Sequence, residues 1–363
     1  MRHEPTDGSY VIAAGGTGGH IFPGIALARE IRARRPKAEV LFVGSGHGLE
    51  RELVPQAGFR LELIRASGFA GKRMTAKLRS LAQLPAGFFQ ARRVLSRRRP
   101  RAVAGVGGYV SVPVVAAARS LNVPTLIHES NAFPGVANRL LNRFATRTAV
   151  GVAAANSHLA RPGVVTGTPV RQEFFQVPPI DPAGGTRRLL VFGGSQGSRI
   201  LNRAMVEAAP LLADDQIEVI HQTGEKEFEE VRAGYGALPG SRKLAPFLPR
   251  IHEELAWADL VLSRAGSQTL AELAAAGRPA ILVPFGSATH GHQTENANLF
   301  ARAGAAVVIE EGSLTGERLA EAVRDVFWDR VWLAGMGESA RAFARPDAAK
   351  LLADLLFEAE GTR

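Results

Sequence analysis

The chain has 363 residues, of which 46% are apolar and 21% charged, and its net charge is +10. This length favours two domains, and the composition is ordinary for a globular protein. The absence of cysteine excludes disulfides and thiolate metal sites and is typical of a reducing compartment. No signal peptide or membrane-spanning segment is predicted, because the longest uncharged run, Ala102–Ala118, is short and broken by glycine and proline.

The charge is unevenly distributed. Residues 1–175 hold 25 Lys and Arg against 9 Asp and Glu, whereas residues 176–363 hold 19 against 25. Between Glu62 and Glu129 there are 12 basic residues and no acidic one. This pattern predicts an anionic partner such as a membrane surface or a phosphorylated substrate, with an Arg-rich solvated surface as the simpler alternative. No nucleic-acid partner is expected, because few aromatic residues accompany the basic ones.

Apolar runs with β-propensity alternate with segments of helical period, which predicts parallel sheets covered by helices. In the first half we expect helices at Pro23–Arg34 and Val112–Leu121, and strands at Tyr10–Ala14, Val40–Val43, Leu61–Ile64, Ala102–Ala104, Thr125–Ile127 and Thr148–Val150. A further helical region, Arg73–Arg93, should be interrupted at Pro85. In the second half we expect a helix at Gln268–Ala276 and strands at Leu189–Phe192, Glu218–His221, Leu260–Leu262, Ala280–Val283 and Ala306–Ile309.

The alternation restarts after Pro169, which predicts a domain boundary with Gly167–Arg171 as its hinge. We therefore expect an N-terminal domain over residues 1–168 and a C-terminal domain over residues 169–345. The last helix, about Ala348–Glu358, could pack on either domain. Residues 346–363 are thus candidates to pack on the N-terminal domain.

Three predicted strands each end in a glycine cluster, at residues 15–19, 105–108 and 193–197. A junction of strand, glycine loop and helix leaves backbone N–H groups at a positive helix N-terminus, where phosphate can bind without a metal. One such loop is weak evidence, since tight turns use glycine anyway. Three at matching strand ends are much stronger evidence for phosphate binding.

The first loop does not fit the common nucleotide motifs. Ile21 stands where a dinucleotide fingerprint needs its third glycine, and Gly44-Ser45 replaces the acidic residue expected after the second strand. No Gly-Lys-Ser/Thr follows the glycines, which excludes a P-loop. His290 and His292 favour a surface pair over a metal site. We therefore predict neither a metal nor a cofactor.

Two residues beside these loops are candidates for chemistry. His20 follows the first loop at the carboxyl end of a strand, where an imidazole could deprotonate a sugar hydroxyl. A helix-capping or structural histidine is the alternative. Glu272 follows a second turn of strand, glycine and helix, at Leu260–Glu272, where it could accept hydrogen bonds from both hydroxyls of a ribose. On its own it would be an ordinary solvated helix residue.

A series of motifs over roughly residues 10–310 resembles the MurG family of bacterial transferases, in glycosyltransferase family 28. The motifs are Ala13–Gly24, Gly107–Ser111, His128–Asn131, Gly167–Arg171, Gly193–Gly197, Arg264–Gly266 with Glu272, Val283–Phe285 and His292–Gln293. The resemblance implies an α/β GT-B fold, in which two Rossmann-like domains with parallel sheets face each other across the active-site cleft. It implies an inverting transfer of N-acetylglucosamine from UDP-N-acetylglucosamine to lipid I, the undecaprenyl-diphosphate-linked acceptor, to form lipid II for peptidoglycan synthesis.

The resemblance also implies roles for individual residues. The residues facing the donor diphosphate would be Thr17, Gly18, Gly19, Arg171 and Ser195. Asn131 would hold the N-acetylglucosamine, and Gln293 its hydroxyls. Uracil and ribose would be held by Leu248, Ser267, Gln268, Thr269, Leu270, Ala271 and Glu272. The chain departs from the family at two places. Ser130 replaces the usual Gln, which puts acceptor contacts there in doubt, and residues 286–291 lack the usual acidic residue.

A lipid-linked acceptor requires a membrane-binding surface if no segment spans the bilayer. The helical region supplies an apolar stripe and a basic rim, made of Met74, Leu78, Leu81, Leu84 or Phe88, and Lys77, Arg79, Arg92 and Arg93. This predicts peripheral binding to anionic lipid at the cytoplasmic face of the bacterial membrane, with a core-facing stripe as the alternative. The nearest alternative functions are a UDP-N-acetylglucosamine epimerase and another lipid glycosyltransferase on the same fold.

Overall fold

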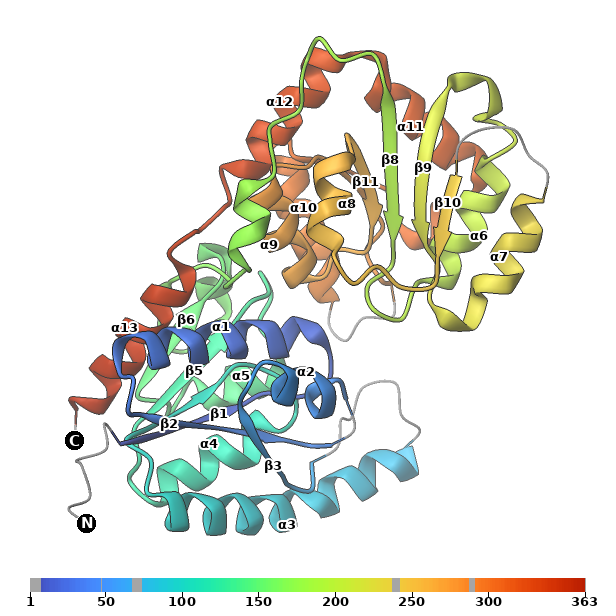
Figure 1. Cartoon of the computed structure of the whole chain (residues 1–363). Helices are drawn as coiled ribbons and strands as arrows, with labels where there is room; N and C mark the ends of the chain where they lie inside the picture. The colour runs from blue at the N-terminus through green and yellow to red at the C-terminus, as the bar shows by residue number, and fades with distance from the viewer. Residues whose placement is uncertain (1–7, 47, 67–73, 237–241, 287–290, 363) are drawn as a thin grey trace. The chain divides into compact units, whose positions relative to one another are not determined.

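The computed structural model in Figure 1 describes residues 8–46, 48–66, 74–236, 242–286 and 291–362, without the side chains of residues 74–84 and 242. The chain divides into two compact units. One combines Met1–Val170 with Asp347–Arg363, and the other is Arg171–Pro346. Within the described ranges, no helix is long and apolar enough to cross a membrane.

The first unit is built on a wholly parallel sheet of seven strands in the order β3-β2-β1-β4-β5-β6-β7. The strands are β1 (Ser9–Ala13), β2 (Glu39–Gly44), β3 (Arg60–Leu63), β4 (Ala102–Gly105), β5 (Thr125–Glu129), β6 (Arg147–Val150) and β7 (Val164–Val165). The helices are α1 (Gly18–Arg34), α2 (Glu50–Gln56), α3 (Met74–Arg98), α4 (Ser111–Ser120), α5 (Val136–Leu141) and α13 (Ala348–Glu360), with the 3-10 helix η1 (Ala153–His158).

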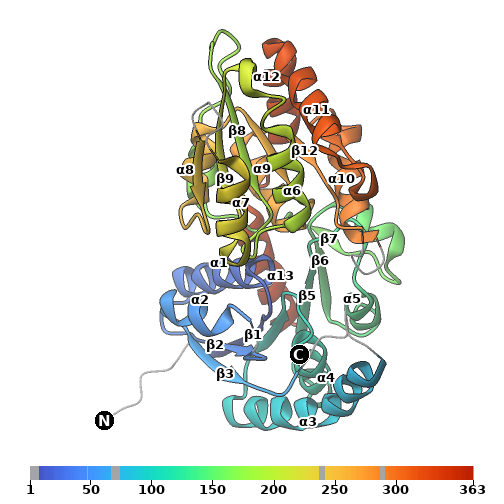
Figure 2. The same cartoon turned by 90° about the vertical axis from the view of Figure 1, so that its right-hand side faces the viewer.

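Strand β1 shows why both faces of this sheet are covered. Its Ile12 packs into a cluster with Leu27 of α1 and Leu352 of α13. The preceding residue, Val11, belongs to the opposite cluster, with Val94 of α3. Because successive side chains of a strand point to opposite faces, a continuously apolar strand requires cover on both. The layers of helix, sheet and helix are visible in Figure 2.

The C-terminal helix α13 completes the first unit. Arg34 of α1 pairs with Asp354 (2.5 Å), and Arg35 pairs with Glu360 (2.6 Å). The hydroxyl of Tyr10 in β1 donates to the same Glu360 carboxylate (2.7 Å). The sequence allowed this helix to pack on either domain, and in the structure it belongs to the first unit.

The second unit has a wholly parallel sheet of six strands in the order β10-β9-β8-β11-β12-β13. The strands are β8 (Arg187–Phe192), β9 (Ile217–Gln222), β10 (Arg242–Ala245), β11 (Leu260–Ser263), β12 (Ala280–Leu282) and β13 (Ala306–Val308). The α-helices are α6 (Arg199–Ala208), α7 (Phe228–Tyr235), α8 (Ile251–Trp257), α9 (Ser267–Ala276), α10 (His292–Arg302), α11 (Gly316–Trp328) and α12 (Arg330–Arg341). Short 3-10 helices are η2 (Gln172–Gln176), η3 (Ala213–Asp215), η4 (Glu225–Glu227) and η6 (Glu311–Ser313). The predicted α/β class with two parallel sheets is confirmed.

Three details of the secondary structure differ from the sequence predictions. Strands β7 and β10 were not predicted, because β7 has only two residues and β10 begins with two charged ones. Helix α1 begins at Gly18, five residues before the expected start at Pro23. The predicted interruption at Pro85 is wrong, since α3 continues through it. The lost backbone hydrogen bond is tolerated because Pro85 is exposed and the following turns bury apolar residues.

The structure describes only part of the apolar stripe and basic rim predicted on α3. The side chains of residues 74–84, including Lys77 and Arg79, lie outside the described part. Phe88 packs against the core, which contradicts its predicted place in an exposed apolar patch, whereas the neighbouring Phe89 is 66% exposed. Adjacent side chains of a helix point about 100° apart, so Phe88 can face the core while Phe89 points away from it.

Candidate active site

Each sheet reverses its strand order once, between β1 and β4 in the first unit and between β8 and β11 in the second. In open α/β sheets, ligands bind at the carboxyl ends of the strands beside such a reversal. The three predicted glycine loops follow β1, β4 and β8, and the Arg264–Gly266 turn follows β11. All four loops therefore lie at the two positions where a ligand is expected.

The loop after β1 leads into the N-terminus of α1. Gly16 has a φ of +94°, and Thr17 is the N-cap residue, with extended backbone and no side-chain capping bond. The first N–H groups of a helix have no acceptor within it. Those of Gly18 and Gly19 are therefore available to an anion at the positive end of the helix. Of the predicted diphosphate-binding residues, Thr17, Gly18 and Gly19 thus lie together.

His20 lies in the first turn of α1, with its ring against the loop after β4. A Cβ on Gly107, which has a φ of +118°, would lie 2.3 Å from Cδ2 of His20, so this contact requires glycine. Burial lowers the pKa of His20, although the charge of Glu129 and the backbone of Gly15 act in the opposite direction. Nδ1 is buried and has no partner among the described residues. The ring is neutral at pH 7, the state a base requires.

Glu129, at the end of β5, organises the loop that carries Asn131. One carboxylate oxygen accepts from the backbone N–H and the side-chain amide of Asn131 (2.9 Å each). The other accepts from the N–H of Gly135 and from Nδ2 of Asn138 (2.9 Å each). Four hydrogen bonds occupy this buried carboxylate, which suits it to fixing Asn131 better than to taking a substrate proton.

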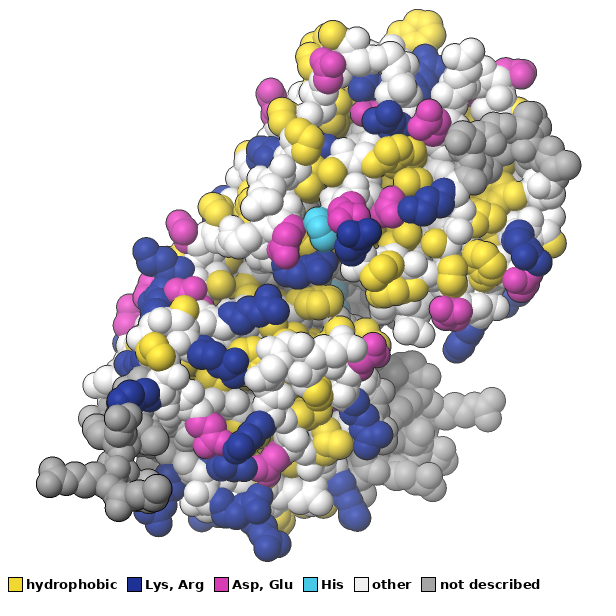
Figure 3. Space-filling model, viewed as in Figure 1, with side chains coloured by type: hydrophobic (Ala, Val, Ile, Leu, Met, Phe, Trp, Pro, Cys, Tyr) yellow, Lys and Arg dark blue, Asp and Glu magenta, His cyan; other side chains and the backbone are white. Residues whose placement is uncertain are grey.

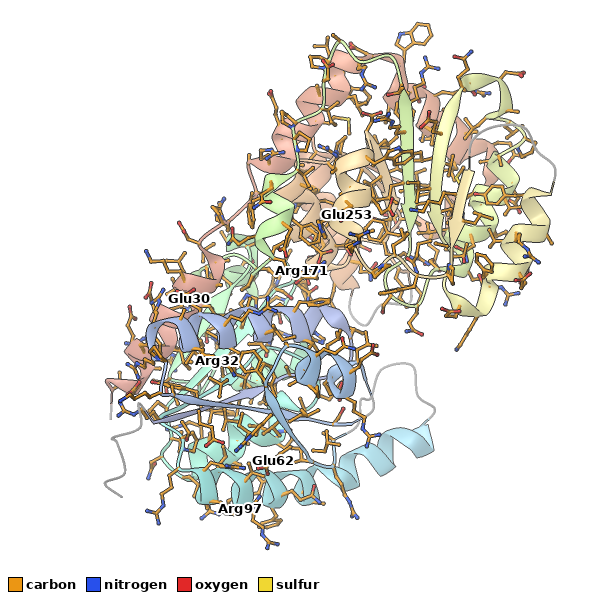
Figure 4. The ribbon with its side chains drawn as sticks, in the orientation of Figure 1. Glu30, Arg32, Glu62, Arg97, Arg171 and Glu253 are labelled. Carbon is orange, nitrogen blue, oxygen red and sulfur yellow. The ribbon has the colours of Figure 1, made fainter. Side chains whose placement is uncertain are left out.

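In the second unit, Glu272 lies on α9 with Gln268 one turn before it. Nε2 of Gln268 donates to Oε1 of Glu272 (3.2 Å), while Oε1 of Gln268 is buried without a partner in the described part of the chain. Burial raises the pKa of Glu272 to about 7, although Gln268 and the charge of Arg171 lower it. Glu272 is half-buried, so it is not a fully solvated helix residue. Arg171, labelled in Figure 4, precedes η2, which contacts α9.

Arg264, directly after β11, joins the loops around this site. Its Nε donates to the hydroxyl of Ser198 after β8 (3.0 Å), and its Nη1 group donates to the carbonyls of Val283 and Pro284 after β12 (3.2 and 3.3 Å). The same group pairs with Glu311 (2.7 Å). Arg264 was part of a recognised motif, but its role as a central anchor depends on contacts that the sequence does not reveal.

The remaining predicted residues are on loops and helix ends at the same edge of the second sheet. Ser195 is exposed in the turn Gly194–Gly197, and Leu248 is buried in the segment after β10. Gln293 lies in the first turn of α10, and its Oε1 accepts from the N–H of Phe285 (3.0 Å). Ser267, Gln268, Thr269, Leu270 and Ala271 form the start of α9. The described residues contain no cluster of three or more side chains suited to a metal ion, and His290 is outside them.

Comparison with known proteins bears on both units. Residues 10–150 match the glycosyltransferase family 28 N-terminal domain, and residues 188–352 match its C-terminal domain. A relative from Anaeromyxobacter dehalogenans, named UDP-N-acetylglucosamine–N-acetylmuramyl-(pentapeptide) pyrophosphoryl-undecaprenol N-acetylglucosamine transferase, is 44% identical over 96% of this chain and 92% of its own. The crystal structure of Acinetobacter baumannii MurG superposes with a TM-score of 0.79 at 30% identity, over 97% of this chain and 99% of that one.

The UDP-GlcNAc 2-epimerase of Neisseria meningitidis also superposes, with a TM-score of 0.69 over 96% of this chain and 100% of that one. Its identity of 12% shows a shared fold alone. The expected two-domain fold is thus confirmed. The family resemblance seen in the motifs is also confirmed, by sequence identities of 30% and 44% to the transferases against 12% to the epimerase. The chain belongs to glycosyltransferase family 28.

Proposed function

We propose that this chain is an inverting glycosyltransferase that moves N-acetylglucosamine from UDP-N-acetylglucosamine to the C4 hydroxyl of N-acetylmuramic acid in lipid I, forming lipid II. The observation that carries the proposal is the 44% identity, over nearly the whole chain, to a transferase named for this reaction. The site supports it: glycine loops at both switch points and a carboxylate on α9 suit a nucleoside diphosphate sugar.

In the proposed reaction, the C4 oxygen of the acceptor attacks C1 of the donor sugar while the bond from C1 to the diphosphate oxygen breaks. His20 takes the hydroxyl proton. The negative charge that develops on UDP is stabilised by Arg171, by the loop of Ser195 and by N–H groups at the start of α9. Thr17, Gly18 and Gly19 supply further N–H groups. UDP leaves from the face opposite the new bond, which inverts the anomeric carbon.

For donor recognition, we assign the ribose to Glu272 and the uracil to Leu248 and the turn at Ser267–Ala271. Asn131 and Gln293 are assigned to the N-acetylglucosamine. Both are held by hydrogen bonds on one side, Asn131 by Glu129 and Gln293 by the N–H of Phe285. Side chains fixed in this way lose little entropy when a sugar binds.

UDP and UDP-N-acetylglucosamine are expected to bind with the same affinity in EDTA as in magnesium. The reason is that N–H groups at helix N-termini and Arg171 supply the positive potential for the diphosphate. Isothermal calorimetry with and without EDTA measures this. The isolated second unit is not needed, because the full chain can be titrated directly. Affinity that disappears on chelation would refute metal-free binding.

We also propose that the chain binds the cytoplasmic face of the bacterial membrane peripherally, through α3. Lys and Arg side chains follow the α3 edge of the first unit in Figure 3. Some of this charge is neutralised: Glu62 accepts from Arg97 (3.0 Å) and Arg98 (2.9 Å) at the end of the helix, and Glu62 and Arg97 lie close together in Figure 4. Phe89 is the exposed aromatic residue of this helix. We assign Phe89 as the side chain that inserts into the lipid headgroup region, because aromatic residues of surface helices bind there.

Co-sedimentation with vesicles is expected to increase with anionic lipid content and to decrease with salt, because each basic contact contributes about 1 kcal/mol. Replacing Phe89 by Ser together with Lys77 and Arg79 by Glu should abolish it while UDP affinity is retained. Phe88 is left intact because it packs in the core. Trp328→Ser, at an 88% exposed aromatic residue of the second unit, is the matched control. A triple variant that still sediments fully would place the membrane contact elsewhere.

A further inference from the structure

Residues 283–286, the loop after β12, are held through their backbone. Strands β11, β12 and β13 are neighbours in the second sheet, so the loops at their carboxyl ends lie side by side. Arg264 after β11 donates to the first two carbonyls of the loop (3.2 and 3.3 Å). Glu311 after β13 accepts through Oε2 from the N–H of Gly286 (3.1 Å). Backbone groups that have left the ladder of a sheet need such partners, and here two neighbouring strand ends supply them.

Arg264 and Glu311 are also paired with each other. Nη1 of Arg264 lies 2.7 Å from the same Oε2 of Glu311, and the two side chains are only 13% and 26% exposed. The other carboxylate oxygen has no partner in the described part of the second unit. The guanidinium carbon of Arg264 lies 5.2 Å from the ring centroid of Phe285, which adds a cation–π contact. One oxygen of Glu311 therefore joins the arginine to the loop.

The same loop sets the orientation of the Gln293 side chain, in the first turn of α10. Oε1 of Gln293 accepts from the N–H of Phe285 (3.0 Å). A backbone N–H can only donate, so this bond decides which end of the amide faces the loop. Nε2 then lies on the other side of the amide carbon with two hydrogens to donate, and none of the described residues accepts them. The amide therefore presents donors to a ligand.

We propose that Glu311 is a positioning residue for Gln293 and acts through residues 283–286, so that the Gln293 amide donates to a hydroxyl oxygen of the donor sugar. Without the Glu311 oxygen, the N–H of Gly286 loses its acceptor and the loop shifts away from Gln293. The last torsion of a glutamine has a broad, two-fold preference, so a released amide presents its oxygen as readily as its nitrogen. This inference rests on the proposed function, in which Gln293 binds the N-acetylglucosamine.

Glu311→Ala in the full chain is expected to raise the Kd of UDP-N-acetylglucosamine about 3–10-fold, the scale of losing one neutral hydrogen bond. The Kd of UDP should change less than about twofold, because UDP lacks the sugar that Gln293 binds. Isothermal calorimetry with each ligand gives the two values. A purely structural role for Glu311 would weaken both ligands alike. Equal weakening of both, or no change in either, overturns the proposal.

Two matched variants separate the hydrogen bonds of Glu311 from its charge. Glu311→Gln keeps an oxygen that can accept from both Gly286 and Arg264, since both bonds go to one atom. Glu310→Ala removes the exposed glutamate that precedes it in the chain. Both variants should bind UDP-N-acetylglucosamine within about twofold of the wild-type Kd. If Glu311→Gln binds as weakly as Glu311→Ala, these bonds do not position Gln293 and the proposal fails.

A double-mutant cycle tests whether Glu311 acts through Gln293. Gln293→Ala alone should weaken binding of UDP-N-acetylglucosamine, and adding Glu311→Ala to it should then change the Kd by less than about twofold. Losses that add in the double variant would show that Glu311 affects the sugar by another route, which overturns the proposal. If Gln293→Ala leaves both Kd values unchanged, the proposed role of Gln293 in sugar binding is wrong instead.

Amide hydrogen exchange, measured by NMR, gives a readout that needs no ligand and decides the coupling even in that case. Glu311→Ala should accelerate exchange at the N–H groups of both Gly286 and Phe285 by about tenfold or more, whereas Glu311→Gln should change neither. Faster exchange at Gly286 alone means that the loop does not transmit the loss to the partner of Gln293, and this overturns the proposal. If circular dichroism shows that Glu311→Ala does not fold, Glu311→Asp, one methylene shorter, replaces it.

Discussion

Replacement of His20 by alanine is expected to reduce kcat by roughly 10²–10⁴-fold, the usual contribution of a general base. The imidazole is at the carboxyl end of β1, it rests on Gly107, and burial keeps the pKa of His20 below its usual value. The neutral ring is therefore the main form at pH 7, and kcat should already be on a plateau there. The dissociation constant of UDP should change little, because its nucleoside is assigned to residues of the second unit.

Steady-state rates with a lipid-linked acceptor analogue, and calorimetry with UDP, give the two quantities. His158→Ala is a matched control, since it removes an exposed histidine of the same unit. Near wild-type turnover in a folded His20→Ala protein would refute the assignment. Glu129 could not then take over as the base, because its oxygens already accept four hydrogen bonds. A water-mediated or substrate-assisted proton transfer would have to be considered instead.

Most strands of both sheets could be predicted from the sequence because buried parallel strands are largely apolar. Ile12 and Val11 illustrate this: both are apolar, and they face opposite, equally covered sides of the sheet. The glycine loops were equally readable, since Gly16 and Gly107 have positive φ values that most other residues adopt only with strain. Strand β10 was missed because an edge strand that starts with Arg242 and Lys243 lacks this pattern.

The roles of side chains that contact residues far away in the sequence could not be predicted. Glu50 contacts Gly16, 34 residues away, and Arg264 pairs with Glu311, 47 residues away. No local pattern distinguishes these from solvated charges, because their roles come from burial and from partners that only the fold brings together. The reverse holds for Pro85: local rules predicted a break in α3, and packing of the following turns overrode it.

Glu272→Ala is expected to weaken UDP binding by about 1.5–3 kcal/mol, the scale of losing hydrogen bonds to a charged acceptor. This corresponds to roughly a 10–100-fold rise in Kd. The carboxylate is held by Gln268 on one side and is close enough to Arg171 to feel its charge. Glu253→Ala, at an exposed glutamate of the same unit, should leave the Kd unchanged. An unaltered Kd in folded Glu272→Ala would show that the ribose is bound elsewhere.

The raised pKa of Glu272 adds a second, independent test. In the free protein burial raises this pKa to about 7, whereas a carboxylate that accepts from both ribose hydroxyls must be ionised. Binding therefore releases a proton, so affinity for UDP-N-acetylglucosamine should increase as the pH rises from 6 to 8 and then level off, by about tenfold per pH unit at most. The sugar nucleotide is the better probe, because its diphosphate carries no terminal phosphate that titrates in this range.

Stability should have the opposite pH dependence. A pKa raised by folding means that the folded chain binds the proton more tightly than the unfolded one. The favourable contribution is complete below the unfolded value of 4.5 and is lost as the pH rises through about 7. Glu272→Gln, which cannot ionise, should thus unfold at a higher temperature than wild type at pH 8 and bind the donor with no pH dependence. If both quantities instead follow wild type from pH 6 to 8, Glu272 is neither the acid with the raised pKa nor the ribose ligand.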